Sequence, residues 1–158
     1  MSEASRTKDI RNPFDVLSKI TDPDKAESLA KNAALKGHTE LEHAARQRAI
    51  VLRGAQVSAN SPFEADLNVA LLAYEAALSQ KNGRKQPASR TRPMIPKYGA
   101  IEAVAKIVRR GPDAIGFSLL VKLGLAQYTF ESLVIKYKEL FDSEVVTLAE
   151  KSMIEYLD

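Results

Sequence analysis

The chain has 158 residues with an apolar fraction of 45%, enough for one domain with a hydrophobic core or for two small ones. It contains no cysteine, which excludes disulfides, thiolate catalysis and cysteine-ligated metal sites and agrees with a cytoplasmic location. The formal net charge is only +3. The sequence opens without a secretory signal and has no apolar run of membrane-spanning length, so we expect no membrane partner.

Residues 1–12 are polar and predict a disordered tail. Helical signals begin near Phe14. The pair Asp22-Pro23 is a typical helix start, because an aspartate caps the helix and proline is well suited to its first position. Gly37 is expected to end that helix.

Two capping boxes follow, in which two side chains three residues apart each satisfy a free amide of the other. Thr39 and Glu42 form the first, and Ser61 and Glu64 form the second. Apolar residues at helical spacing follow both boxes, and the second helix is the clearest amphipathic helix of the chain. We therefore predict an N-terminal helical unit over residues 13–80.

The next stretch, residues 81–97, is predicted to be a basic loop. Three prolines within it prevent a long helix and favour extended backbone before each proline. Residues 98–158 again carry helical patterns and form a predicted C-terminal helical unit. Within that unit, residues 114–123 are apolar nearly all round, so we expect them to be the most buried helix.

No segment shows the sustained alternation of a strand. The predicted fold class is therefore all-α, a compact bundle of about six to eight short helices. Two arrangements are open: the basic loop joins two helical subunits, or residues 13–80 and 98–158 form one domain.

The positive charge is concentrated in one region. Residues 81–111 carry nine lysines or arginines and one acid, a net charge of +8, whereas residues 1–80 carry −1 and residues 112–158 carry −4. A concentrated field of one sign attracts polyanions, of which nucleic acid is the commonest. The first hypothesis is therefore a nucleic-acid-binding protein, with DNA favoured over RNA.

The predicted contacts lie in and beside the basic loop. In an extended Ser-Arg-Thr-Arg stretch, both arginines point to one side, where each guanidinium can grip a phosphate, and the hydroxyls add neutral donors. The candidate nucleic-acid-binding residues are Lys81, Arg84, Lys85, Ser89, Arg90, Thr91, Arg92 and Lys97.

Several alternatives stay open. The loop is a solvated linker, or Arg90 or Arg92 pairs with acids of the flanking units, or the loop docks on an acidic protein partner. Arg109 and Arg110 lie at a helix end, where cations interact favourably with the helix dipole. A nucleic-acid-processing enzyme is the remaining alternative.

No catalytic residue can be named from the sequence. The histidines, His38 and His43, are five residues apart, which is not the spacing that places two ligands on one helix face, so we predict no metal site. The chain has no phosphate-binding glycine loop and no nucleophile motif, and we predict no cofactor.

The chain also resembles a group of uncharacterised bacterial proteins over roughly residues 38–145. The resemblance implies a bacterial source, but no activity and no site residues. The stretches that carry it include Lys81-Asn82-Gly83-Arg84, Ala88-Ser89-Arg90-Thr91-Arg92, Gly99-Ala100-Ile101-Glu102, Gly124-Leu125 and Phe130-Glu131.

Overall fold

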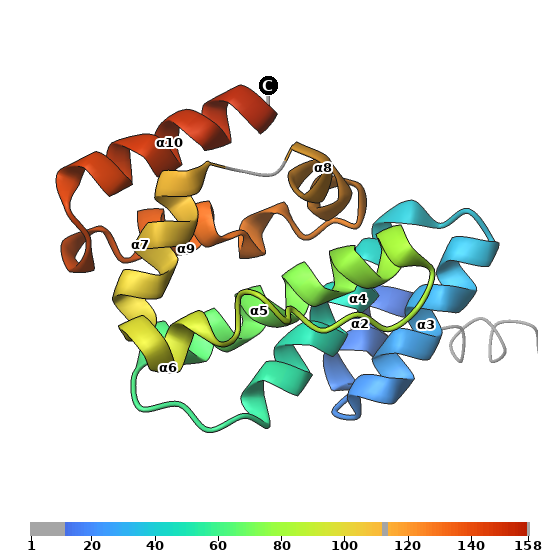
Figure 1. The fold of residues 1–158 in the computed structure, drawn as a ribbon. Coiled ribbons are helices and arrows are strands. Elements are labelled where there is room, and N and C mark those ends of the chain that lie inside the picture. Colours follow the sequence, from blue (N-terminus) through green and yellow to red (C-terminus); the bar gives the residue numbers. More distant parts are fainter. Residues whose placement is uncertain (1–11, 112–113, 158) are drawn as a thin grey trace, which may run out of the picture. The chain divides into compact units, whose positions relative to one another are not determined.

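The computed structural model describes residues 12–111 and 114–157 of the chain (Figure 1). In these residues the chain forms nine α-helices and two short 3-10 helices and no strand, which confirms the predicted all-α fold. The predicted tail, apart from Asn12, lies outside the described residues. Within the described ranges, none of the helices has both the length and the apolar character that crossing a membrane requires.

The chain divides into two units, the first ending at Leu52 and the second beginning at Arg53. The boundary falls inside one helix, α4 (Thr39–Ala55), and not at residues 81–97, where one of the two predicted arrangements divides the chain. The basic residues belong to the second unit together with the helices before and after them, because those helices pack against one another.

The first unit has a small core built largely of alanine. Leu17, Ala30 and Ala45 are buried and contact one another. The Arg48 guanidinium donates two hydrogen bonds, of 3.0 and 2.9 Å, to the Ile20 carbonyl oxygen just after the first helix. The helices of this unit are α2 (Pro13–Lys19), α3 (Pro23–Leu35) and the first part of α4.

Helix starts follow the local signals, with one correction. The Asp22 carboxylate accepts a hydrogen bond from the Asp24 amide at 2.9 Å, as a cap does. The predicted capping box at Thr39 is wrong by one residue, because Thr39 is already helical and the Glu42 amide donates to the carbonyl of His38. The Glu42 carboxylate instead pairs with Arg46 on the next turn.

The second unit contains the long helix α5, which packs against α8 and α9, while α10 packs against α7 and α9 (Figure 1). The Ser61 hydroxyl caps α5 by accepting from the Glu64 amide at 3.1 Å. The α-helices of this unit after α4 are α5 (Pro62–Asn82), α6 (Met94–Tyr98), α7 (Ala100–Arg110), α8 (Ala114–Lys122), α9 (Phe130–Lys136) and α10 (Ser143–Leu157), with 3-10 turns η1 (Ala126–Tyr128) and η2 (Lys138–Leu140).

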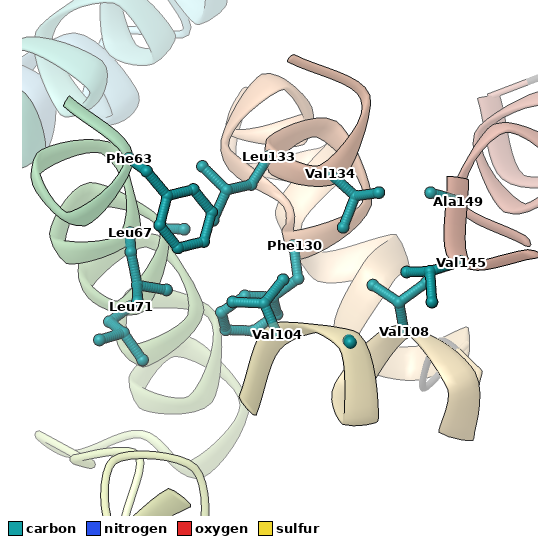
Figure 2. Packing of buried hydrophobic residues seen from close by; sticks show 12 residues of the cluster. Phe63, Leu67, Leu71, Val104, Val108, Phe130, Leu133, Val134, Val145 and Ala149 are labelled. Atoms are coloured by element: carbon teal, nitrogen blue, oxygen red, sulfur yellow. The ribbon is translucent and has the colours of Figure 1, made fainter. Parts of the chain in front are cut away.

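One hydrophobic cluster joins these helices. Phe130 of α9 lies beside Val104 of α7 near the middle of the cluster (Figure 2). Side chains of α5 cover it from one side and side chains of α10 from the other. Its fully buried or nearly buried members include Phe63, Leu67, Leu71, Val104, Val108, Phe130, Leu133, Val134, Val145 and Ala149.

Helix α8 is not the uniformly buried helix that its apolar sequence predicts. Among its described side chains, Phe117 and Leu120 are buried, but Val121 is 39% exposed. The more deeply buried segment is α9, where even Glu131 is only 6% exposed. A helix that packs on the core through one face buries only the apolar residues of that face, so its other apolar residues remain at the surface.

Candidate nucleic-acid interface

The basic residues follow α5 in a segment that turns back along that helix; we call residues 83–93 the strap. Gly83, in the left-handed conformation with φ of 69°, ends α5 and reverses the chain. The Gln86 amide then donates to the Ser79 hydroxyl at 2.9 Å, and the Ala88 amide donates to a Glu75 carboxylate oxygen at 2.6 Å. The strap is therefore fixed to α5 at two backbone positions.

The Ser-Arg-Thr-Arg stretch is not extended as predicted. The amides of Thr91 and Arg92 both donate to the Ala88 carbonyl, at 3.2 and 2.9 Å, so the chain makes a tight turn that leads into α6. In a helix-like turn, residues two positions apart lie on roughly opposite sides, whereas in an extended strand they lie on the same side. Arg90 and Arg92 consequently do not share the single phosphate-facing side that an extended strand would give them.

Arg92 is committed to an internal ion pair, which confirms the alternative in which one of these two arginines pairs with a flanking acid. Its Nε and Nη2 atoms donate to the two carboxylate oxygens of Glu75 at 2.8 and 2.6 Å. Burial alone would raise the pKa of Glu75, but hydrogen bonds from Arg92 and Ala88 lower that pKa below its ordinary value. The hydrogen bond to Glu75 in turn raises the pKa of Arg92.

The remaining strap cations face solvent. Arg84, Lys85 and Arg90 are exposed, and in the described part of the chain none of them makes an ion pair. The same holds for Lys81 at the end of α5 and for Lys97 in α6, although the Lys97 ammonium lies 5.1 Å from the ring centre of Tyr98. Five of the eight predicted contact residues are thus exposed cations without an ion pair in the described part of the chain, all within residues 81–97.

The two predicted hydroxyl donors lie differently. Ser89 is exposed, and its hydroxyl makes a long hydrogen bond of 3.5 Å to the Pro87 carbonyl. Thr91 is half-buried and lines a pocket. Of these two hydroxyls, only that of Ser89 is placed to meet a ligand at the open surface.

The two arginines at the end of α7 have different roles. Arg109 bonds Glu144 at 2.8 Å and also contacts Glu102 and Asp142, so it ties α7 to the start of α10. These contacts, the Glu144 hydrogen bond above all, raise the pKa of Arg109. Arg110, predicted to complement the helix dipole, lines the same pocket as Thr91.

This pocket was not predicted from the sequence. It has a free volume of about 130 Å³ and lies within the second unit. Its lining residues come from α5, the strap, α7, α8 and the start of α9: Tyr74, Thr91, Ile107, Arg110, Gly111, Phe117, Leu120, Thr129, Phe130 and Glu131. The one signal of this pocket in the sequence is an acid, Glu131, inside the apolar pattern of α9.

Glu131 is the unusual member of the pocket lining. Burial raises the pKa of its carboxyl, and the opposing contact is a hydrogen bond from the backbone amide of Glu131 itself. No other side chain in the described ranges pairs with it. A titratable group whose pKa is shifted by burial beside a pocket is a candidate functional residue.

The histidines do not form a metal site in the described part of the chain, where no three acidic or histidine side chains gather closely enough to share an ion. Arg46 of α4 pairs with Glu42, so its guanidinium is also committed within the chain.

Comparison of the chain with protein-family models, with curated proteins and with solved structures finds no match. The resemblance to uncharacterised bacterial proteins therefore stays a prediction.

Proposed function

We propose that the protein binds nucleic acid, with duplex DNA favoured, through the exposed cations of the strap and its two ends. The observation that carries the proposal is that Arg84, Lys85 and Arg90 are exposed and without ion pairs in the described ranges, on a backbone fixed to α5. Lys81 and Lys97 extend this group at either end. We call these five cations the basic surface.

The fixed backbone supports binding because ordering a flexible segment opposes association. Here the hydrogen bonds to Glu75 and Ser79 order the strap before any ligand arrives. The acid that holds the strap, Glu75, is paired with Arg92 and also interacts with the charge of Lys85, so its own negative charge is largely offset. The role of Arg92 in this proposal is to position the strap, and the phosphate contacts fall to its neighbours.

Duplex backbone fits better than a single strand, because Tyr98 is the one exposed aromatic residue within residues 81–98. Sequence-tolerant single-strand binding relies on several bases stacking on aromatic rings. A cytoplasmic location, where nucleic acid is accessible and thiols stay reduced, is part of the same proposal and is consistent with the absence of cysteine.

The test is fluorescence anisotropy of a labelled random duplex at several salt concentrations. Five phosphate contacts predict a slope of log affinity against log salt of roughly −4 to −5. Replacing Arg84, Lys85 and Arg90 by alanine leaves two contacts and predicts a slope of about −2. The matched control removes three exposed lysines elsewhere, Lys25, Lys138 and Lys151, with the same change in net charge.

The expected result is that the strap variant binds far more weakly while the control variant binds nearly as the wild type does. A wild type with no salt-sensitive binding, or two variants with equal losses, would contradict the proposal. In the first case a pulldown with the wild type and the strap variant would test the acidic-protein alternative.

A further inference from the structure

The pocket beside the strap has the size and walls for one flat ring. Tyr74, Phe117 and Phe130 contribute aromatic side chains, and Ile107 and Leu120 contribute aliphatic ones. The Tyr74 and Phe130 rings meet edge to face with their centres 5.8 Å apart. The free volume of about 130 Å³ is close to the roughly 150 Å³ of an apolar cavity that holds benzene. The pocket is partly open to solvent, so its walls can hold a planar ring while the rest of the ligand stays outside.

The polar groups of the pocket determine which hydrogen-bonding groups a bound ring must have. Glu131 is 94% buried, and its carboxyl accepts a hydrogen bond from its own backbone amide, which leaves acceptor capacity for a donor on a ligand. The Thr129 hydroxyl is already used, since it accepts from the Ser132 amide at 3.0 Å and caps α9. The Thr91 hydroxyl makes no hydrogen bond within the described residues. The pocket therefore offers a ligand the Glu131 carboxylate as an acceptor and the Thr91 hydroxyl as a donor or acceptor.

Arg110 adds a positive charge to the lining. It is exposed and makes no ion pair in the described part of the molecule. An exposed guanidinium beside the pocket can form paired hydrogen bonds with a phosphate attached to the bound ring. Thr91 belongs both to the pocket and to the strap, so the pocket lies next to the basic surface.

We propose that this pocket binds the base of a cytosine nucleotide, with Glu131 accepting from the exocyclic amino group and Arg110 contacting the phosphate. The choice of a nucleobase rests on the proposed function. Cytosine is the pyrimidine that offers an amino donor where thymine and uracil offer a carbonyl acceptor, and acidic side chains read it in this way. The carboxylate therefore selects cytosine and rejects uracil.

The test titrates isotopically labelled protein with cytidine monophosphate and uridine monophosphate and follows backbone amide shifts by NMR. Saturable shifts at residues such as Ile107 and Leu120 are expected with the cytidine nucleotide, at least about tenfold tighter than with the uridine nucleotide. In Glu131→Gln the difference in affinity between the cytidine and uridine nucleotides should become smaller, because an amide can donate to uracil as well as accept from cytosine. Glu150→Gln, an exposed acid of α10, is the matched control and keeps the preference.

A second arm compares labelled duplexes that carry one unpaired cytosine or one unpaired thymine. A preference for the unpaired cytosine that Glu131→Gln removes assigns the ligand to nucleic acid. A cytidine response without any duplex binding assigns it to a free nucleotide, in which case the inference stands and the proposed function fails. Duplex binding by the basic surface with no cytosine preference in either arm overturns the inference and leaves the proposed function intact.

Discussion

Arg92 holds Glu75 through two parallel hydrogen bonds, and the Glu75 oxygen that accepts from Arg92 Nε also accepts from the Ala88 amide. One carboxylate of α5 thus fixes both the backbone and a side chain of the strap. Arg90, two residues from Arg92 in the same stretch, takes no part in this arrangement and faces solvent. The two arginines therefore have different expected effects when they are replaced.

The first prediction separates these roles by stability. Arg92→Ala is expected to lower the free energy of unfolding by about 1 kcal/mol, because the Arg92–Glu75 ion pair is bidentate but partly exposed to solvent. Glu75→Ala is expected to cost about 1–3 kcal/mol, because the Ala88 amide also loses its partner. Arg90→Ala should change stability by less than about 0.5 kcal/mol. Urea unfolding followed by circular dichroism measures all three, and equal effects of the two arginine replacements would contradict the assignment.

The same carboxylate predicts a dependence on pH. The folded protein holds the pKa of Glu75 below its ordinary value of 4.5, so the unfolded chain binds more protons in the interval between the two. The contribution of Glu75 is therefore complete above pH 4.5 and is lost as the pH falls through the lowered pKa. Wild type should lose more stability than Glu75→Gln over this interval, and parallel curves would argue against the shift.

The helix starts could be predicted because their causes are local. The caps at Asp22 and Ser61 depend on residues two or three positions away, which the sequence displays directly. The strap could not be predicted in the same way. Its turn is fixed by Glu75, which is 17 residues from Arg92, and nothing local distinguishes Arg92 from Arg90 as the partner of that acid.

The pocket was missed for a related reason. The spacing of Phe130, Leu133 and Val134 correctly indicates a buried helix face, and it says nothing of which neighbouring positions are also covered. Glu131 becomes buried because the pocket lining comes from other helices as well as from its own. Periodicity describes one helix at a time, whereas a pocket depends on how several helices meet.

Another prediction concerns the close approach of α4 and α5 at Gly54. A Cβ atom placed on Gly54 would lie 2.6 Å from Val69 Cγ2, which requires movement of a stiff branched side chain. Gly54→Ala is therefore expected to destabilise the protein by about 1–3 kcal/mol, although alanine favours a helix by about 1 kcal/mol over glycine.

Val69→Ala removes the clashing methyl group, so the double variant Gly54→Ala/Val69→Ala should be more stable than the sum of the two single effects predicts. Urea unfolding of the four proteins in this cycle measures the coupling. Additive effects would show that the contact is not the cause of the loss.

A further prediction concerns Tyr137, whose hydroxyl donates to Asp66 of α5 beside a 2.8 Å ion pair between Lys136 and Asp66. The hydrogen bond to Asp66 raises the pKa of Tyr137 above its ordinary value of 10.0. In Asp66→Asn that pKa should fall towards 10.0, because the accepting carboxylate charge is gone. Alkaline titration of tyrosinate absorbance, with Tyr137→Phe subtracted to isolate this residue, measures the change. An unchanged titration in Asp66→Asn would place the cause elsewhere.

The last prediction concerns the free energy that Glu131 costs the folded protein. Burial raises the pKa of this carboxyl, so between its ordinary value of 4.5 and the raised value the folded state binds more protons than the unfolded chain. Stability attributable to this group therefore falls as the pH rises through that interval. Glu131→Gln should be more stable than wild type at pH 7 by on the order of 1 kcal/mol, and the difference should vanish below pH 4.5.

Thermal unfolding of the two proteins across this pH range measures the difference, with Glu150→Gln as the exposed control that shows no such trend. A ligand that donates to the buried carboxylate should remove part of the penalty, because it binds the folded state alone. Cytidine monophosphate is thus expected to raise the unfolding temperature of the wild type more than that of Glu131→Gln. If Glu131→Gln instead lowers stability at pH 7, the carboxylate has a stabilising partner and is not available to a ligand.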